Sequence, residues 1–125
     1  MVEGLEESAL WQQLRKRHAE IGPALVRVIG LPSTVHEIIE EYQPAQWMAH
    51  ALNGIALMSI STPGEIRRLR QKYRTIIERA PVEVRREIAT FGLNDTEYEL
   101  MKQMKQTFDP EGRLNPGRHV DGERA

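Results

Sequence analysis

Asn53-Gly54 separates two apolar segments of similar length, residues 46–52 and 55–61, and no other feature restricts the fold as much. A two-residue hairpin loop needs a positive φ at both central positions, and Asn followed by Gly tolerates that conformation best. We therefore expect the two segments to pair as antiparallel strands around a two-residue turn.

The two faces of this predicted hairpin differ in the size of their side chains. Pairing outward from the turn puts these residues opposite each other on one face: Leu52 and Ile55, His50 and Leu57, Met48 and Ser59. The other face pairs Ala51 with Ala56, Ala49 with Met58 and Trp47 with Ile60. Because small side chains let a helix approach closely, we expect helices on the alanine face. The His50 face is then expected to stay open.

Two more segments have the character of strands. Residues 24–30 are short, rich in β-branched side chains and preceded by Gly22-Pro23. Residues 75–79 are similar and end shortly before Pro81. Both predict short strands.

Helices are predicted between and around these strands. Two cover residues 8–21 and 84–91, and three more begin at N-terminal capping patterns. The patterns are Thr34 with Glu37, Thr62 with Glu65, and Asn94 with Glu97. In the last of these helices, Met101 and Met104 are expected to fill the core. We also expect Phe108 and Leu114 to pin the segment after it to the core.

From residue 24 to residue 79 the predicted order is strand, helix, strand, strand, helix, strand. This is the order of the ferredoxin-like fold, an α+β sandwich whose antiparallel sheet carries helices on one face. We expect one domain over residues 1–125, with its core at about 24–79, flanking N-terminal and C-terminal helices, and a closing helix and turn segment over 94–120.

Composition narrows the possible chemistry. The chain has 125 residues, a net charge of -1 and no cysteine, which excludes disulfides, a cysteine nucleophile and Cys-ligated metal centres held by this chain. Its four histidines lack metal-ligand spacing, so no metal site is expected. The N-terminus is acidic and no apolar run is long enough to cross a bilayer. We expect a cytoplasmic protein, or one peripheral on the inner membrane as part of a complex.

Basic residues crowd the segment 67–74, which could be a solvated helix face or a patch for nucleic acid. Sheets of this type that bind RNA stack bases on strand aromatics, and residues 55–60 contain none. The solvated face is favoured, and no nucleic-acid partner is expected.

The closing residues carry the most specific pattern, K-Q-x-F-D-P-x-G-x-L-N-P-G-R over residues 105–118. Together with the helix before it, this stretch resembles the closing signature of FAD-linked oxidases and dehydrogenases of the vanillyl-alcohol-oxidase and p-cresol-methylhydroxylase type. The chain looks most similar to the FAD-binding subunit of bacterial glycolate oxidase.

The resemblance implies a C-terminal cap domain that lays its sheet over a flavin held by a separate N-terminal FAD-binding domain. It also implies that Asn115, Pro116, Gly117 and Arg118 lie near the flavin or the domain seam. No glycine-rich phosphate-binding segment of such a domain occurs here, so this chain alone is expected neither to bind FAD tightly nor to turn over. Met1 would then begin a part of a longer enzyme, one that oxidises a 2-hydroxy acid such as glycolate.

Two polar residues of the predicted open face suit such a substrate. Arg27 is expected to hold a carboxylate and His50 to take the hydroxyl proton during hydride transfer. An iron–sulfur partner, if the enzyme uses one, would be another chain, because this one has no cysteine. Because an isolated cap would expose apolar surface meant for its missing partner domain, self-association of the isolated domain is expected. The alternative is a stand-alone ferredoxin-like module that uses its open sheet for binding or oligomerisation.

Overall fold

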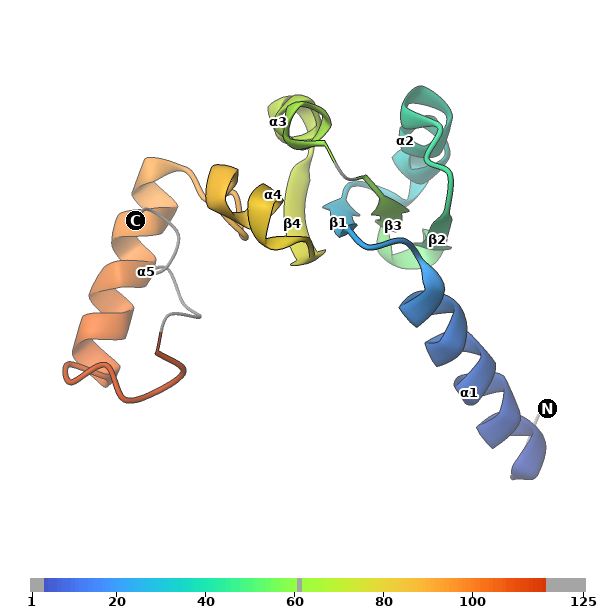
Figure 1. Cartoon of the computed structure of the whole chain (residues 1–125), viewed down its shortest axis with the longest axis horizontal. Coiled ribbons are helices and arrows are strands. Elements are labelled where there is room, and N and C mark those ends of the chain that lie inside the picture. The colour runs from blue at the N-terminus through green and yellow to red at the C-terminus, as the bar shows by residue number, and fades with distance from the viewer. Residues whose placement is uncertain (1–3, 61, 117–125) are drawn as a thin grey trace.

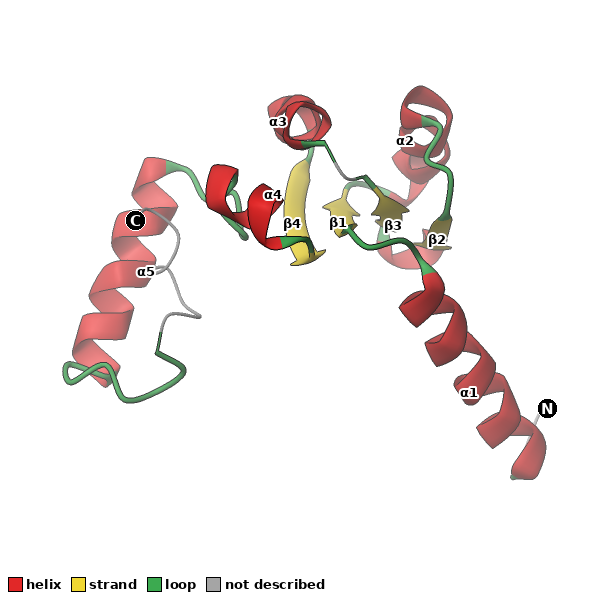
Figure 2. Ribbon diagram, in the orientation of Figure 1, coloured by secondary structure: helices red, strands yellow, loops and turns green. Residues whose placement is uncertain are grey.

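The computed structural model describes residues 4–60 and 62–116, which form a four-stranded sheet with helices (Figures 1 and 2). The strands are β1 (Leu25–Ile29), β2 (Trp47–His50), β3 (Ile55–Ser59) and β4 (Arg74–Arg79). Their order is β2-β3-β1-β4, and all neighbours are antiparallel. This order, with the predicted helices between the strands, confirms the ferredoxin-like α+β fold.

Helices α2 (Val35–Tyr42) and α3 (Pro63–Lys72) lie on the same side of the sheet (Figure 1), and the short α4 (Val82–Glu87) follows β4. Alternate strand residues and the inner faces of these helices make the core, in which a dozen or so apolar side chains are buried. Its most enclosed members include Val26, Val28, Ile38, Met58, Ile66 and Leu69. Ala49 and Ala56 belong to this layer, so the helices cover the alanine face, as expected.

The hairpin between β2 and β3 forms, but its turn differs from the predicted one. Residues Ala51–Asn53 make a 3-10 turn, and only Gly54 takes a positive φ, of 67°. Consequently His50 lies opposite Ile55 and Ala49 opposite Ala56, so the predicted pairing was wrong by two residues. Because side chains alternate with a period of two, the residues that pair in β2 and β3 stay on their predicted faces, whereas Ala51 and Leu52 lie in the turn instead.

Backbone packing explains why this turn needs glycine. The Gly30 N–H donates to the Gly54 carbonyl over 2.8 Å, and a Cβ on Gly54 would lie 2.1 Å from the Gly30 oxygen. The end of β1 therefore lies directly against the turn, which fixes the turn's path independently of the Asn-Gly propensity.

Two of the three capping patterns start helices without the predicted capping bonds. Thr34 is the last residue of a 3-10 turn (Pro32–Thr34), and its hydroxyl reaches back to the Leu31 backbone, at 3.1 Å from N and 2.9 Å from O. The Thr62 hydroxyl donates to the Glu65 carboxylate rather than accepting a backbone N–H. Only the third pattern, ahead of the last helix, forms a reciprocal capping box.

The two end helices, α1 (Leu5–Glu20) and α5 (Asp95–Phe108), reach away from the sheet in different directions (Figure 1). No side chain of α5 is buried. The prediction that Met101 and Met104 fill the core was wrong: Met101 is half-buried, Met104 is exposed, and the helix does not pack on the sheet. Apolar spacing identified the helix correctly but could not tell which surface it meets.

Candidate functional site

The sheet face opposite α2 and α3 is the candidate site, and the register places its residues in rows. Arg27 of β1 lies opposite Leu57 of β3, which lies opposite Met48 of β2. The next row contains Ile29, Ile55 and His50. Leu25 and Leu57 are buried under Ile21, so one end of this face is covered and the His50 end is not.

Arg27 lies within a cluster of charged side chains. Its guanidinium forms an ion pair with Glu78 of β4, and His18 Nε2 lies 3.3 Å from the second oxygen of the same carboxylate. The Glu78 side chain is only 19% exposed. The positive charge of Arg27 is therefore compensated within the chain, so binding of an anion there competes with Glu78.

His50 lies at the uncovered end of the face, is exposed, and has no hydrogen-bond or ion-pair partner among the described residues. One strand separates it from Arg27. Two strand spacings and a two-residue offset put the two Cα atoms about 12 Å apart. The structure thus places both residues on the open face, but with Leu57 and Ile55 of β3 between them rather than in contact.

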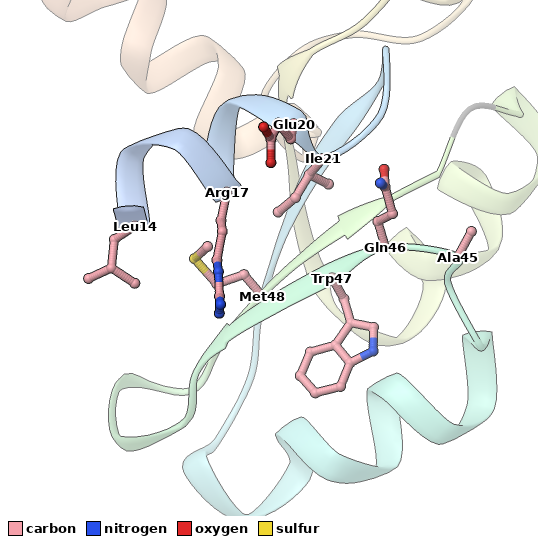
Figure 3. A pocket seen from close by; sticks show the side chains of 8 residues that line it. All are labelled: Leu14, Arg17, Glu20, Ile21, Ala45, Gln46, Trp47 and Met48. Carbon is pink, nitrogen blue, oxygen red and sulfur yellow. The ribbon is translucent and has the colours of Figure 1, made fainter. Parts of the chain in front are cut away.

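An open pocket of about 460 Å³ lies where the end of α1 meets the start of β2 (Figure 3). It is lined by Leu14, Arg17, Glu20, Ile21, Ala45, Gln46, Trp47 and Met48. Gln46 closes one side, because its Oε1 accepts the Gly22 N–H over 2.8 Å. Sequence reasoning missed this pocket, since nothing in the local pattern shows that α1 ends against β2.

Arg79 holds the end of α1 on the sheet. Its guanidinium donates to the carbonyls of Ala19, Ile21 and Gly22, over 3.3, 2.6 and 3.1 Å. These carbonyls have no partner within the helix, and a cation at a helix C-terminus is favourable. The pocket therefore has one fixed wall, although the rest of α1 extends into solvent.

The closing segment folds around the carboxylate of Asp109. This carboxylate binds the Lys105 ammonium and accepts the N–H groups of Arg113 and Leu114, each over 2.8 Å. Lys105 also donates to the Leu114 carbonyl over 2.6 Å. The Lys105 hydrogen bond, followed by those of Leu114 and Arg113, lowers the pKa of Asp109 below its usual value.

The structure describes only some of the closing-segment residues that the sequence singled out. Asn115 takes a positive φ of 47°, and Pro116 is exposed, whereas Gly117 and Arg118 lie outside the described residues. Phe108 and Leu114 do not pin the segment to the core: they are 78% and 63% exposed. Asp109 and Lys105 supply that fixation instead, through polar bonds that apolar spacing could not reveal.

The basic segment around α3 is matched by acidic groups of this chain. Arg68 and Lys72 both bind Glu41, at 3.5 and 2.8 Å, and Arg74 binds Glu97 at 2.5 Å. Hydrogen bonding to Lys72 lowers the pKa of Glu41. The solvated-face interpretation is therefore favoured over a nucleic-acid patch.

Neither a membrane-spanning helix nor a cluster of metal ligands occurs in the described part of the chain. No helix there is long and apolar enough to cross a membrane. Within the same residues, no three His, Asp or Glu side chains come together as metal ligands.

Comparison with curated proteins and with solved structures gives no match. A family model does match, from within α4 through the closing segment, while the sheet lies outside the matched range. The family is described as FAD linked oxidases, C-terminal domain, and the matched residues are 84–119. This match supports a C-terminal domain of an FAD-linked oxidase.

Proposed function

We propose that the chain is the cap domain of an FAD-dependent oxidoreductase that oxidises a 2-hydroxy acid such as glycolate. The observation that carries the proposal is the family match over residues 84–119, which includes the Asp109-centred turn. A ferredoxin-like sheet with one uncovered face agrees with a domain that covers a flat cofactor.

The residues present fit one part of FAD. Met48 and Ile55, which are only partly buried on the open face, offer apolar surface that suits contact with a planar ring. No glycine-rich phosphate-binding segment occurs in the sequence, so the diphosphate would be held by an N-terminal FAD-binding domain. Bound FAD would accept the hydride from the substrate carbon that carries the hydroxyl.

This chain's own residues would bind and orient the substrate. In this proposal His50 takes the hydroxyl proton as the carbonyl forms, and its exposed position without a competing partner suits that role. Arg27 would bind the substrate carboxylate by exchanging part of its pairing with Glu78. Covering of the open face would exclude water from this step.

The partners follow from the same proposal. One is the FAD-binding domain, and another is an iron–sulfur subunit, which would take electrons onward because this chain has no cysteine to hold a cluster. Such a complex would be cytoplasmic or peripheral on the inner membrane.

The proposal is tested by expressing residues 1–125 together with the FAD-binding domain encoded beside them, and adding glycolate without oxygen. We expect the visible flavin absorbance to bleach, and His50→Gln to slow the bleaching about a hundredfold. His36→Gln on α2, also exposed, is the matched control and should leave the rate unchanged. If no FAD-binding domain is encoded beside the chain, the proposed cap function is wrong. If His50→Gln leaves the bleaching rate unchanged, the proposed role of His50 is wrong.

The second candidate function is a stand-alone module that uses the open face for binding or oligomerisation. Ile29 on the open face and Leu31 just after β1 favour it, because they are 36% and 66% exposed and leave apolar surface at this end of the sheet for a partner. It predicts that the purified chain binds a protein partner and that no FAD-binding domain is encoded with it.

A further inference from the structure

Helix α1 presents an apolar strip without a partner inside the described part of the chain. Leu10, Trp11 and Leu14 are 47%, 54% and 37% exposed, and only the end of the helix is fixed to the sheet. α1 has 16 residues, and most of the stability of helices in proteins comes from packing of an apolar face rather than from helix propensity. A second surface that packs on this strip would therefore stabilise the helix.

The charges of α1 are divided between its two ends. Glu6 and Glu7 lie in the first turn, and residues 15–17 near the other end are all basic, while Glu20 at the last position pairs with Lys16. At 100° per residue, Glu7, Leu10, Leu14 and Arg17 fall within about 80° of one side of the helix. Figure 3 shows Leu14 and Arg17 projecting from the same side, beside Met48.

We propose that this side of α1 is a homodimer interface, in which two copies of the chain pair their α1 helices antiparallel about a two-fold axis. Leu10 of one copy then lies against Leu14 of the second copy, and Glu7 of one lies against Arg17 of the second. A two-fold axis produces each contact twice. The inference does not depend on the proposed catalytic function.

A second copy is the occupant that this charge pattern favours. Antiparallel pairing puts the acidic end of each helix against the basic end of the other, whereas parallel pairing would put Glu7 against Glu7. Within one chain the two residues lie about 15 Å apart along the helix, too far to bind each other. The open pocket beside Leu14 leaves room for the first turn of the second copy's α1.

Charge reversal tests the proposed contacts by sedimentation equilibrium of the whole chain. Glu7→Arg and Arg17→Glu should each raise the dimer dissociation constant about tenfold, because each turns two attractions into repulsions. The double variant restores both attractions and should return the constant to near the original value. Lys16→Glu makes the same charge change on another side of α1, where Lys16 faces Glu20, and should have little effect.

Circular dichroism separates loss of pairing from loss of the helix. Both reversals oppose the helix dipole, so the double variant should have the least stable helix in isolation and yet recover the dimer. A monomer at all concentrations overturns the proposal. Equal effects of Arg17→Glu and Lys16→Glu on the dimer dissociation constant overturn the proposal as well. So does a double variant whose dimer remains as weak as that of the single variants.

Single cysteines test the antiparallel arrangement directly, because the chain has none of its own. Under mild oxidation, a mixture of Glu7→Cys and Arg17→Cys chains should form a disulfide between unlike chains. Neither variant alone should form one at a comparable rate. Disulfides between two Glu7→Cys chains would show a parallel pair and overturn the proposal.

Discussion

The carboxylate of Asp109 binds the ammonium of Lys105 one helical turn earlier, and the two side chains are only 7% and 12% exposed. The helix that carries Lys105 contributes no side chain to the apolar core of the described residues. A nearly enclosed ion pair therefore holds together a segment that the apolar core does not reach. The backbone of the turn completes the arrangement, because the N–H groups of Arg113 and Leu114 point at the same carboxylate.

Asp109→Asn should loosen this turn without unfolding the sheet. The amide keeps one acceptor oxygen but loses the charge, so it cannot satisfy Lys105 and two N–H groups together. Hydrogen exchange at Arg113 and Leu114 should rise about tenfold, and exchange at buried Val26 should not change. Glu111→Gln, which removes a carboxylate two residues away, is the control.

The same carboxylate gives the turn a defined pH dependence. Because the folded pKa of Asp109 is below its usual value, the stabilisation is fully present above that usual value. It is lost as the pH falls through the lowered pKa. NMR titration of the Arg113 and Leu114 amides should follow this loss, and the Asp109→Asn variant should show no such step.

Gly54→Ala should be among the most destabilising single-methyl changes in the chain. The new Cβ would lie 2.1 Å from the Gly30 carbonyl oxygen at a residue whose φ is 67°, and the two costs together amount to about 2–4 kcal/mol. Gly64→Ala is the matched control, since nothing lies within 4 Å of its Cβ and it is in a helix. Thermal melts should show a large drop for the first and little change or a gain for the second.

Arg79→Ala should release α1 from the sheet. It removes the donor to three carbonyls at the end of the helix, at a cost of about 2 kcal/mol. Limited proteolysis should then cut near residues 15–17, while Arg85→Ala, an exposed arginine on α4, should leave the cutting pattern unchanged. Equal protection in both variants would show that apolar contacts of Ile21 alone hold the helix end.

The sequence predicted most of the sheet because strands depend on a short-range pattern. The shift of two residues in the hairpin accompanies a contact between Gly54 and Gly30, which is distant in sequence and meets Gly54 only when β1 and β3 pair. Less of the candidate site could be predicted from the sequence. The open face followed from the alternation of side chains, but the pairing of Arg27 with Glu78 needed the register of β1 and β4. The role of Asp109 needed the path of the turn.

Because α5 lies away from the core, the residues of this chain are constrained in two different ways. Substitutions in the sheet and its two covering helices are limited by the volume of a shared interior. Phe108 and Leu114 lie outside that interior, so folding of this chain alone would tolerate polar residues at both positions. Large apolar side chains at such places suit a surface that another molecule covers, as the proposed cap domain would require of its closing segment.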